Sequence, residues 1–183
     1  MDEDRLMQRA ATGDVQAFGM LVKTYQQRLV RFAGRMLADR EHAEDVAQEA
    51  FVRLWRARAH YRPQGNFGCY LLRIVRNVCL DVGRSTHPVS PLEDAEGLPA
   101  GGESLERQVE AQTLACAVRR TVQELPEPQR VVFVLSQYEG LSYVEIAQVL
   151  DCPVGTVASR KRLAVETLRR RLGGWVEREE EKQ

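Results

Sequence analysis

Apolar residues recur every three or four positions through the first 84 residues of the chain. Residues at this spacing share one face of an α-helix, so the pattern predicts amphipathic helices. After a short helix over residues 3–11, a long helix is expected to begin behind Asp14, which follows Gly13 and suits an N-cap. Two more helices are expected over residues 43–55 and 70–82. The first part of the chain is therefore predicted to form a helical bundle.

The helical pattern stops over residues 85–103. This segment contains three prolines, three glycines, four acidic residues and no Lys or Arg. Such a composition favours a flexible acidic linker over a packed element.

Helical spacing resumes at Ser104 and continues to Pro126. A following helix over residues 131–138 is expected to end at Gly140, since glycine is the residue most often found just beyond a helix. The fold class is thus predicted to be all-α, with two small helical domains. The two domains are predicted over residues 1–84 and 104–172. Residues 85–103 are predicted to form the linker between them, and residues 173–183 a charged tail.

The second domain contains a short helix followed by a basic one. Ser142 and Glu145 have the spacing of a capping box, which opens the short helix. After a turn of three residues, a last helix is expected from Val154 to about Leu172. A capped helix, a tight turn and a basic helix are typical of a helix-turn-helix DNA-binding motif. The alternative is an ordinary solvated helix.

In a helix-turn-helix motif, the N-terminal residues of the second helix meet base edges in the major groove. Thr156, Ser159 and Arg160 are the candidate readers, because hydroxyl groups can bond bases or phosphates and arginine can pair both acceptors of guanine. Lys161 and Arg162 add positive charge beside them. Lys161 also falls on the apolar stripe of the helix, where its stem could lie along the core.

Two polar surfaces in the first domain are candidate binding sites. Asp45, Gln48 and Glu49 share a face of the helix over residues 43–55, where they could dock a basic protein surface. Charge alone, however, favours the simpler interpretation that this face is a solvated surface.

The second polar surface lies on the helix over residues 70–82. There Arg73, Arg76 and Asn77 place cations beside an amide that can bond a base. The loop before that helix, with Tyr61 and Asn66, resembles the aromatic and polar pockets that hold single-stranded nucleic acid. Phe67 and Tyr70 are interpreted more simply as core residues.

Composition limits the other function classes. The chain has 183 residues and a net charge of zero, which is unusual for a DNA-binding protein. The zero is a cancellation: residues 1–83 and 110–172 carry net charges of +3 and +2, whereas residues 84–109 and 173–183 carry −3 and −2. Both helical domains therefore keep a positive balance.

No signal peptide is evident, and no stretch reaches the roughly 18 apolar residues that span a bilayer, so a cytoplasmic protein without stable membrane association is expected. The four cysteines lack metal-binding spacing and are interpreted as buried, reduced thiols. No metal or other cofactor is expected. No phosphate-binding glycine loop or hydrolase motif occurs, so an enzyme is disfavoured.

Three ordered stretches together resemble extracytoplasmic-function (ECF) RNA polymerase sigma factors. They are AEDVAQEAFVRLW at 43–55, FGCYLLRIVRNVCLD at 67–81, and GLSYVEIA with CPVGTVASR at 140–147 and 152–160. The main alternative is a stand-alone helix-turn-helix regulator, which would not be expected to contain the stretches at 43–55 and 67–81. The residues after Arg160 depart from the family pattern, which would give this protein an unusual −35 preference.

The resemblance implies a role for each surface. Asp45, Gln48 and Glu49 would bind the clamp helices of the largest subunit of core RNA polymerase. Asn77 and the loop over residues 61–66, flanked by the arginines, would read and open the −10 promoter element. Thr156, Ser159 and Arg160 would read the −35 element. The family is usually held inactive by an anti-sigma factor, and its members have no catalytic residue because nucleotidyl transfer belongs to the core enzyme.

Overall fold

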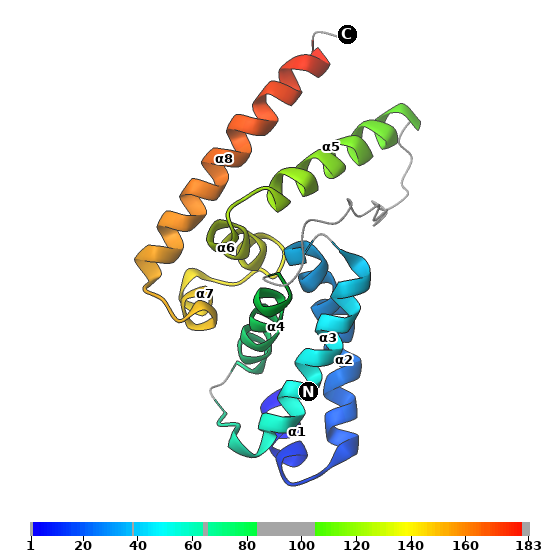
Figure 1. The fold of residues 1–183 in the computed structure, drawn as a ribbon, viewed down its shortest axis with the longest axis vertical. Helices are drawn as coiled ribbons and strands as arrows, with labels where there is room; N and C mark the ends of the chain where they lie inside the picture. Colours follow the sequence, from blue (N-terminus) through cyan, green and yellow to red (C-terminus); the bar gives the residue numbers. More distant parts are fainter. Residues whose placement is uncertain (1, 38, 64–65, 84–104, 181–183) are drawn as a thin grey trace.

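The computed structural model describes residues 2–37, 39–63, 66–83 and 105–180, and all regular structure in these ranges is helical (Figure 1). This confirms the predicted all-α fold class. The predicted linker lies outside the described residues. The elements are α1 (Glu3–Ala11), α2 (Val15–Leu37), α3 (Arg40–Ala57), the 3-10 turn η1 (Arg58–His60), α4 (Phe67–Gly83), α5 (Leu105–Gln123), α6 (Glu127–Gln137), α7 (Tyr143–Leu150) and α8 (Val154–Glu180).

Local signals in the sequence account for where several helices begin and end. Asp14 Oδ1 accepts a hydrogen bond of 2.9 Å from the Ala17 amide, which caps α2 behind the left-handed Gly13. Ser142 and Glu145 form the predicted capping box at the start of α7. Asp151 ends α7 in the left-handed conformation, with φ of 51°.

Helix α8 is longer than the sequence predicted, since it continues to Glu180 rather than ending near Leu172. Two glycines follow Leu172, at positions 173 and 174, but the helix continues through them. Each glycine disfavours a helix by only about 1 kcal/mol, and the Glu and Arg residues that follow favour one. The segment predicted as a charged tail is thus largely helical in its backbone.

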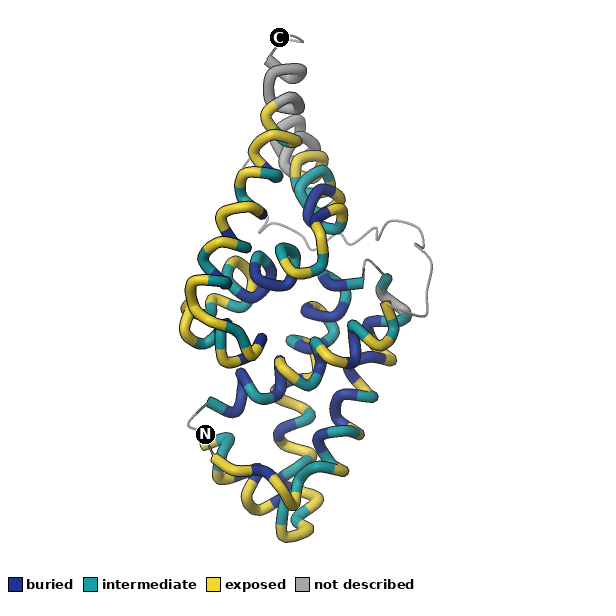
Figure 2. Tube along the Cα trace, turned by 60° about the vertical axis from the view of Figure 1, so that its left-hand side comes forward, coloured by how far each residue is buried: buried dark blue, intermediate teal, exposed yellow. Residues whose placement is uncertain are grey.

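Helices α1 to α4 pack around a core to which α2 and α4 contribute many large buried side chains. Fully buried members include Leu21, Leu29, Phe32, Leu54, Leu71 and Val75. In the second domain, α6, α7 and α8 enclose a smaller core. Buried residues run through both domains in Figure 2.

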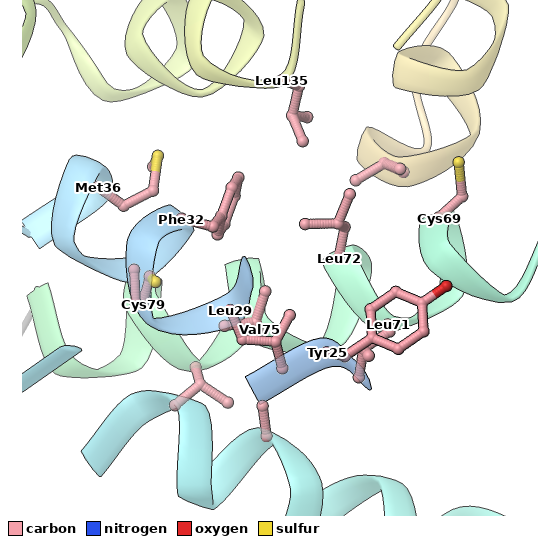
Figure 3. Close-up of a cluster of buried hydrophobic side chains, with 14 of the residues drawn as sticks. Tyr25, Leu29, Phe32, Met36, Cys69, Leu71, Leu72, Val75, Cys79 and Leu135 are labelled. Carbon is pink, nitrogen blue, oxygen red and sulfur yellow. The ribbon is translucent and has the colours of Figure 1, made fainter. Parts of the chain in front are cut away.

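The two domains pack directly against each other. Figure 3 shows Leu135 of α6 pointing toward Phe32 of α2 and Leu72 of α4. None of these three side chains is more than 1% exposed. Burying a leucine side chain contributes about 1.5–3 kcal/mol, so this contact favours the closed arrangement. The predicted pair of domains therefore shares one continuous apolar core.

Candidate nucleic-acid interface

The acidic face of α3 lies on the surface of the first domain. Asp45 and Gln48 are exposed, and Glu49 is half-buried. Glu49 accepts a 2.8 Å hydrogen bond from Arg53 Nε, while Arg53 Nη1 donates to Asp81 of α4 at 2.8 Å. These two bonds raise the pKa of Arg53, the one to Glu49 more strongly. Arg53 therefore fixes Glu49 and leaves Asp45 and Gln48 as the outward polar groups of this face.

An apolar residue extends the same face of α3. Val52 is 41% exposed and follows Asp45 and Gln48 at helical spacing, seven and four residues later. Sequence reasoning did not single out Val52, although its helical spacing from Asp45 and Gln48 would have placed it on this face. Beside the face, a groove of about 320 Å³ runs between α3 and α4, with Val46 and Val78 among its lining residues. Polar groups and an apolar surface thus lie next to each other here.

The residues predicted to meet single-stranded DNA gather on α4 and at its start. Arg73 and Asn77 are exposed, and Arg76 is half-buried. Asn66 lies just before α4, where its Oδ1 accepts a 3.0 Å hydrogen bond from the Cys69 amide and caps the helix. The structure therefore brings four of the five predicted residues together.

Tyr61, the fifth residue predicted at this surface, lies elsewhere. Its ring is only 8% exposed and packs edge-on against Phe67, and its hydroxyl donates to Asp4 of α1. Burial, followed by the hydrogen bond to Asp4, raises the pKa of Tyr61. The ring belongs to the core of the first domain because the loop turns it inward, so it supports the loop rather than facing solvent.

Three of the four gathered residues contact carboxylates of the second domain. Asn66 Nδ2 donates to Glu145 Oε1 at 2.8 Å. Arg73 Nη2 lies 3.4 Å from Asp151 Oδ2, and Arg76 Nη2 lies 3.8 Å from Glu127 Oε1. Sequence reasoning had no signal for these contacts, since their partners are more than 50 residues apart in the chain.

The helix-turn-helix motif is present in α7 and α8. Ser159 and Arg162 are exposed, while Thr156 and Arg160 are half-buried. Ser159 Oγ donates to the Thr156 carbonyl at 3.0 Å, and Arg162 pairs with Glu166 at 2.7 Å. Among the described residues, Arg160 has no hydrogen-bond or ion-pair partner. The start of α8 therefore presents a hydroxyl group and guanidinium groups to the surface.

Lys161 was predicted to add positive charge at the DNA-facing surface together with Arg162. It does not lie on that exposed face. It is 8% exposed; its Nζ donates to Ser136 Oγ of α6 and lies 4.5 Å from the centre of the Phe133 ring. Burial lowers the pKa of this ammonium group. The apolar stripe explains the placement, because a residue four positions after Val157 points into the core.

The cysteines only partly follow their predicted burial. Cys69 and Cys79 are buried, and burial raises the pKa of Cys79 to about 12. Cys152 is half-buried, and the prediction is wrong for Cys116, which is exposed. Within the described ranges, no cluster of His, Cys, Asp and Glu could hold a metal ion, and no helix is long and apolar enough to cross a membrane.

Comparisons with known proteins match both halves of the chain. The family description "Sigma-70 region 2" matches residues 21–87, and "Sigma-70, region 4" matches residues 117–168. The RNA polymerase sigma-H factor of Pseudomonas aeruginosa is 38% identical over 168 residues, covering 86% of this chain and 87% of that protein. The ECF RNA polymerase sigma-E factor of Escherichia coli K12 is 36% identical over 165 residues, covering 85% and 86%.

A solved structure has the same arrangement of helices. It is that of CnrH in complex with the cytosolic domain of CnrY, with a TM-score of 0.73 and 28% identity, covering 94% of this chain and 97% of that one.

Replacing Lys161 by methionine tests the placement of its ammonium group. We expect K161M to keep the fold and to gain roughly 1 kcal/mol in unfolding free energy at pH 7, because removing a buried charge can stabilise a core. The pKa of Lys161 is lowered on folding, so the unfolded chain holds the proton more tightly and wild-type stability rises with pH. The advantage of K161M should therefore shrink as the pH approaches 10.5, the ordinary value for lysine.

Thermal unfolding at pH 7 and at higher pH measures this difference. Lys23 is exposed on α2, so K23M is the matched control and should change neither stability nor its pH dependence. A K161M protein that melts well below wild type at both pH values would show that the contacts of the ammonium group outweigh its desolvation.

Proposed function

The chain belongs to the ECF group of the sigma-70 family of RNA polymerase sigma factors, and from this premise we propose how its two domains divide the recognition of a promoter. The protein directs core RNA polymerase to promoters and assists DNA opening. The observation that carries this function is the presence of both family regions, in order, over most of one chain. A stand-alone regulator would need only the second.

The first domain binds core polymerase through the exposed face of α3. Asp45 and Gln48 supply polar groups, and Arg53 holds Glu49 beside them. Val52 adds an exposed apolar contact on the same face. A mixed polar and apolar strip of this kind fits a basic, amphipathic helix pair such as the clamp helices of the largest subunit.

The −10 element is read by the surface of α4. Opening DNA costs about 1.4 kcal/mol for each stacked step, so the protein must bind the separated strand to offset that loss. Asn77 can bond a base edge, while Arg73 and Arg76 lie near the path of the backbone. Asn66 lies at the loop that would receive an unstacked base.

The −35 element is read by the start of α8. Thr156, Ser159 and Arg160 lie on the face that a helix-turn-helix motif turns toward the major groove. Arg162 lies beside them and is available to phosphate once it leaves Glu166. Lys161 instead faces α6 from the buried side of α8, where it contacts Ser136 and the Phe133 ring.

The remaining properties of the protein follow from the same premise. It has no catalytic residue, since the core enzyme performs nucleotidyl transfer, and it acts in the cytoplasm, where polymerase is. An anti-sigma factor is its proposed regulator. The complex of the similar protein CnrH with the cytosolic domain of CnrY supports control by a second protein.

Run-off transcription tests the function directly. Core polymerase with this protein should produce promoter-dependent transcripts from upstream regions of its own genome, and core polymerase alone should not. If no template gives such a transcript while the protein still binds duplex DNA as a dimer, the stand-alone regulator would replace the sigma-factor assignment.

The α3 face is tested with D45A/Q48A. We expect this variant to melt like wild type, since both side chains are exposed, and to lose co-purification with core polymerase by at least roughly tenfold, as for an interface centre. The control Q112A/E166A also removes one amide and one carboxylate, both exposed, from the second domain. Undiminished binding of D45A/Q48A would remove this face from the polymerase interface.

The −35 readers are tested with R160A. We expect the holoenzyme to lose about 1–3 kcal/mol of discrimination at one −35 base pair, as measured by binding to duplexes that differ at single positions. R169A, which removes an exposed arginine further along α8, should weaken all duplexes alike if it lowers affinity at all. Equal losses on every duplex for R160A would contradict a base-reading role.

A further inference from the structure

We propose that Lys161 is a positioning residue for the −35 element, which determines sequence preference without touching DNA. Its hydrogen bond to Ser136 of α6 fixes the rotation of α8 about its own axis. That rotation sets the angle at which Thr156, Ser159 and Arg160, here called the readers, meet the bases. The proposal rests on the −35 role assigned above to the start of α8.

The buried side of α8 is otherwise apolar. Val157, Ala164 and Leu168 are buried at helical spacing with Lys161, and they face α6, which lies against α8 (Figure 1). Apolar burial has no preferred direction. A core of suitable volume therefore loses its unique arrangement before it loses its stability. These three residues favour burial of this side of α8 but constrain its rotation only through their shape.

Lys161 supplies a directional contact. Its Nζ donates to Ser136 Oγ, and Ser136 Oγ donates in turn to the Phe133 carbonyl at 3.1 Å. The ammonium group also lies 4.5 Å from the centre of the Phe133 ring. Hydrogen bonds form only within a narrow range of distance and angle. Because the Lys161 stem is packed in the core, these contacts together allow only a narrow range of rotation of α8.

The contact lies at the level of the readers along α8. A second hydrogen bond joins α8 to the rest of the domain, from Arg171 to Glu124, but both side chains are exposed. Arg171 is also about 15 Å further along the helix axis than Lys161. Lys161 is therefore the better placed of the two to fix the start of the helix.

A small rotation of α8 would misplace the readers. Each residue advances about 100° around a helix, so Arg160 is next to Lys161 and Ser159 lies nearly opposite it. A side-chain tip lies about 5–6 Å from the helix axis, so a rotation of about 20° moves it by about 2 Å. Hydrogen bonds to base edges tolerate a spread of only about 0.5 Å. A rotation that apolar packing could absorb would thus break base contacts.

Stability does not account for a lysine at this position. Burial lowers the pKa of Lys161, which means that the charged form is disfavoured there. An apolar residue of similar volume is often neutral or stabilising in place of a buried charge. A buried polar group can instead select one arrangement of a core at some cost in stability. Selection of one rotation is the role that the contacts of Lys161 support.

The effect on DNA must act through α8. Lys161 is 8% exposed and its ammonium group faces α6, so it is not available to phosphate. Both partners of the hydrogen bond lie in the second domain. The contact therefore does not depend on how the two domains are arranged.

The variants S136A and K161M break the hydrogen bond from opposite ends. The measurement is binding of the holoenzyme to duplexes that differ at single −35 base pairs, starting from a sequence that the wild-type holoenzyme selects. We expect either variant to lose roughly three- to tenfold in discrimination at several base pairs, because a rotation moves all readers together. S136A keeps every charge, so it remains informative if K161M does not fold.

Melting separates positioning from stability. S136A leaves the ammonium group buried without its hydroxyl partner and should melt below wild type. K161M should melt at or above wild type, and the apolar pair K161M/S136A should melt above S136A. All three should lose discrimination alike, since the same bond is absent. Discrimination that follows the melting temperature, or losses that add up in the double variant, would overturn the proposal.

Two controls bear on the hydroxyl group of Ser136. S136T keeps that group and should retain wild-type discrimination. Gln137, the next residue on α6, is exposed, so Q137A removes a polar group without touching α8 and should also leave discrimination unchanged. An equal loss in Q137A would assign the effect to α6 in general and contradict a specific role of the bond.

R160A distinguishes a failure of this proposal from a failure of the −35 assignment. It is expected to relax discrimination at one base pair, whereas K161M and S136A act at several. If R160A relaxes discrimination while K161M and S136A keep the wild-type pattern, the positioning role is overturned and the −35 role stands. If none of the three variants changes the pattern, both are contradicted.

Discussion

The packing of α6 on α2 and α4 is the contact on which the rest of the structure depends. Leu135 lies fully buried beside Phe32 and Leu72, so the two domains share one core. This contact brings the acidic side of the second domain against the cationic side of the first. Without it, Arg28, Arg73 and Arg76 would not lie within reach of their carboxylate partners in the second domain.

The shared core gives the neutral charge of the chain a structural meaning. Each domain carries a small positive net charge. Part of the positive charge of the first domain is paired with carboxylates of the second, as in the ion pairs Arg28–Glu139 and Arg73–Asp151. Arg73 and Arg76 would have to leave Asp151 and Glu127 before they could pair with phosphate groups of DNA. We propose that core polymerase, docking on the outward face of α3, supplies the energy that separates the domains. A sigma factor organised in this way would read promoters only as part of the holoenzyme.

Local chemistry made much of the fold predictable. Asp14 and Ser142 cap their helices as their sequence context indicates, and helical spacing places Asp45 and Gln48 outside and Lys161 inside. Features that depend on distant residues were not predictable. The pairing of Arg28 with Glu139 joins positions 111 residues apart, and the inward turn of Tyr61 depends on Asp4. The −10 role of Asn66, Arg73 and Arg76 stays a prediction from their residue types, whereas their contacts with the second domain follow only from tertiary packing.

We expect the domains to be closed in the free protein and to separate when polymerase binds. Energy transfer between fluorophores at exposed positions 26 on α2 and 169 on α8 measures this directly, with and without core polymerase. High transfer efficiency is expected in the free protein, with a clear fall in a holoenzyme that is active in promoter-dependent transcription. An unchanged efficiency in that active holoenzyme would contradict it.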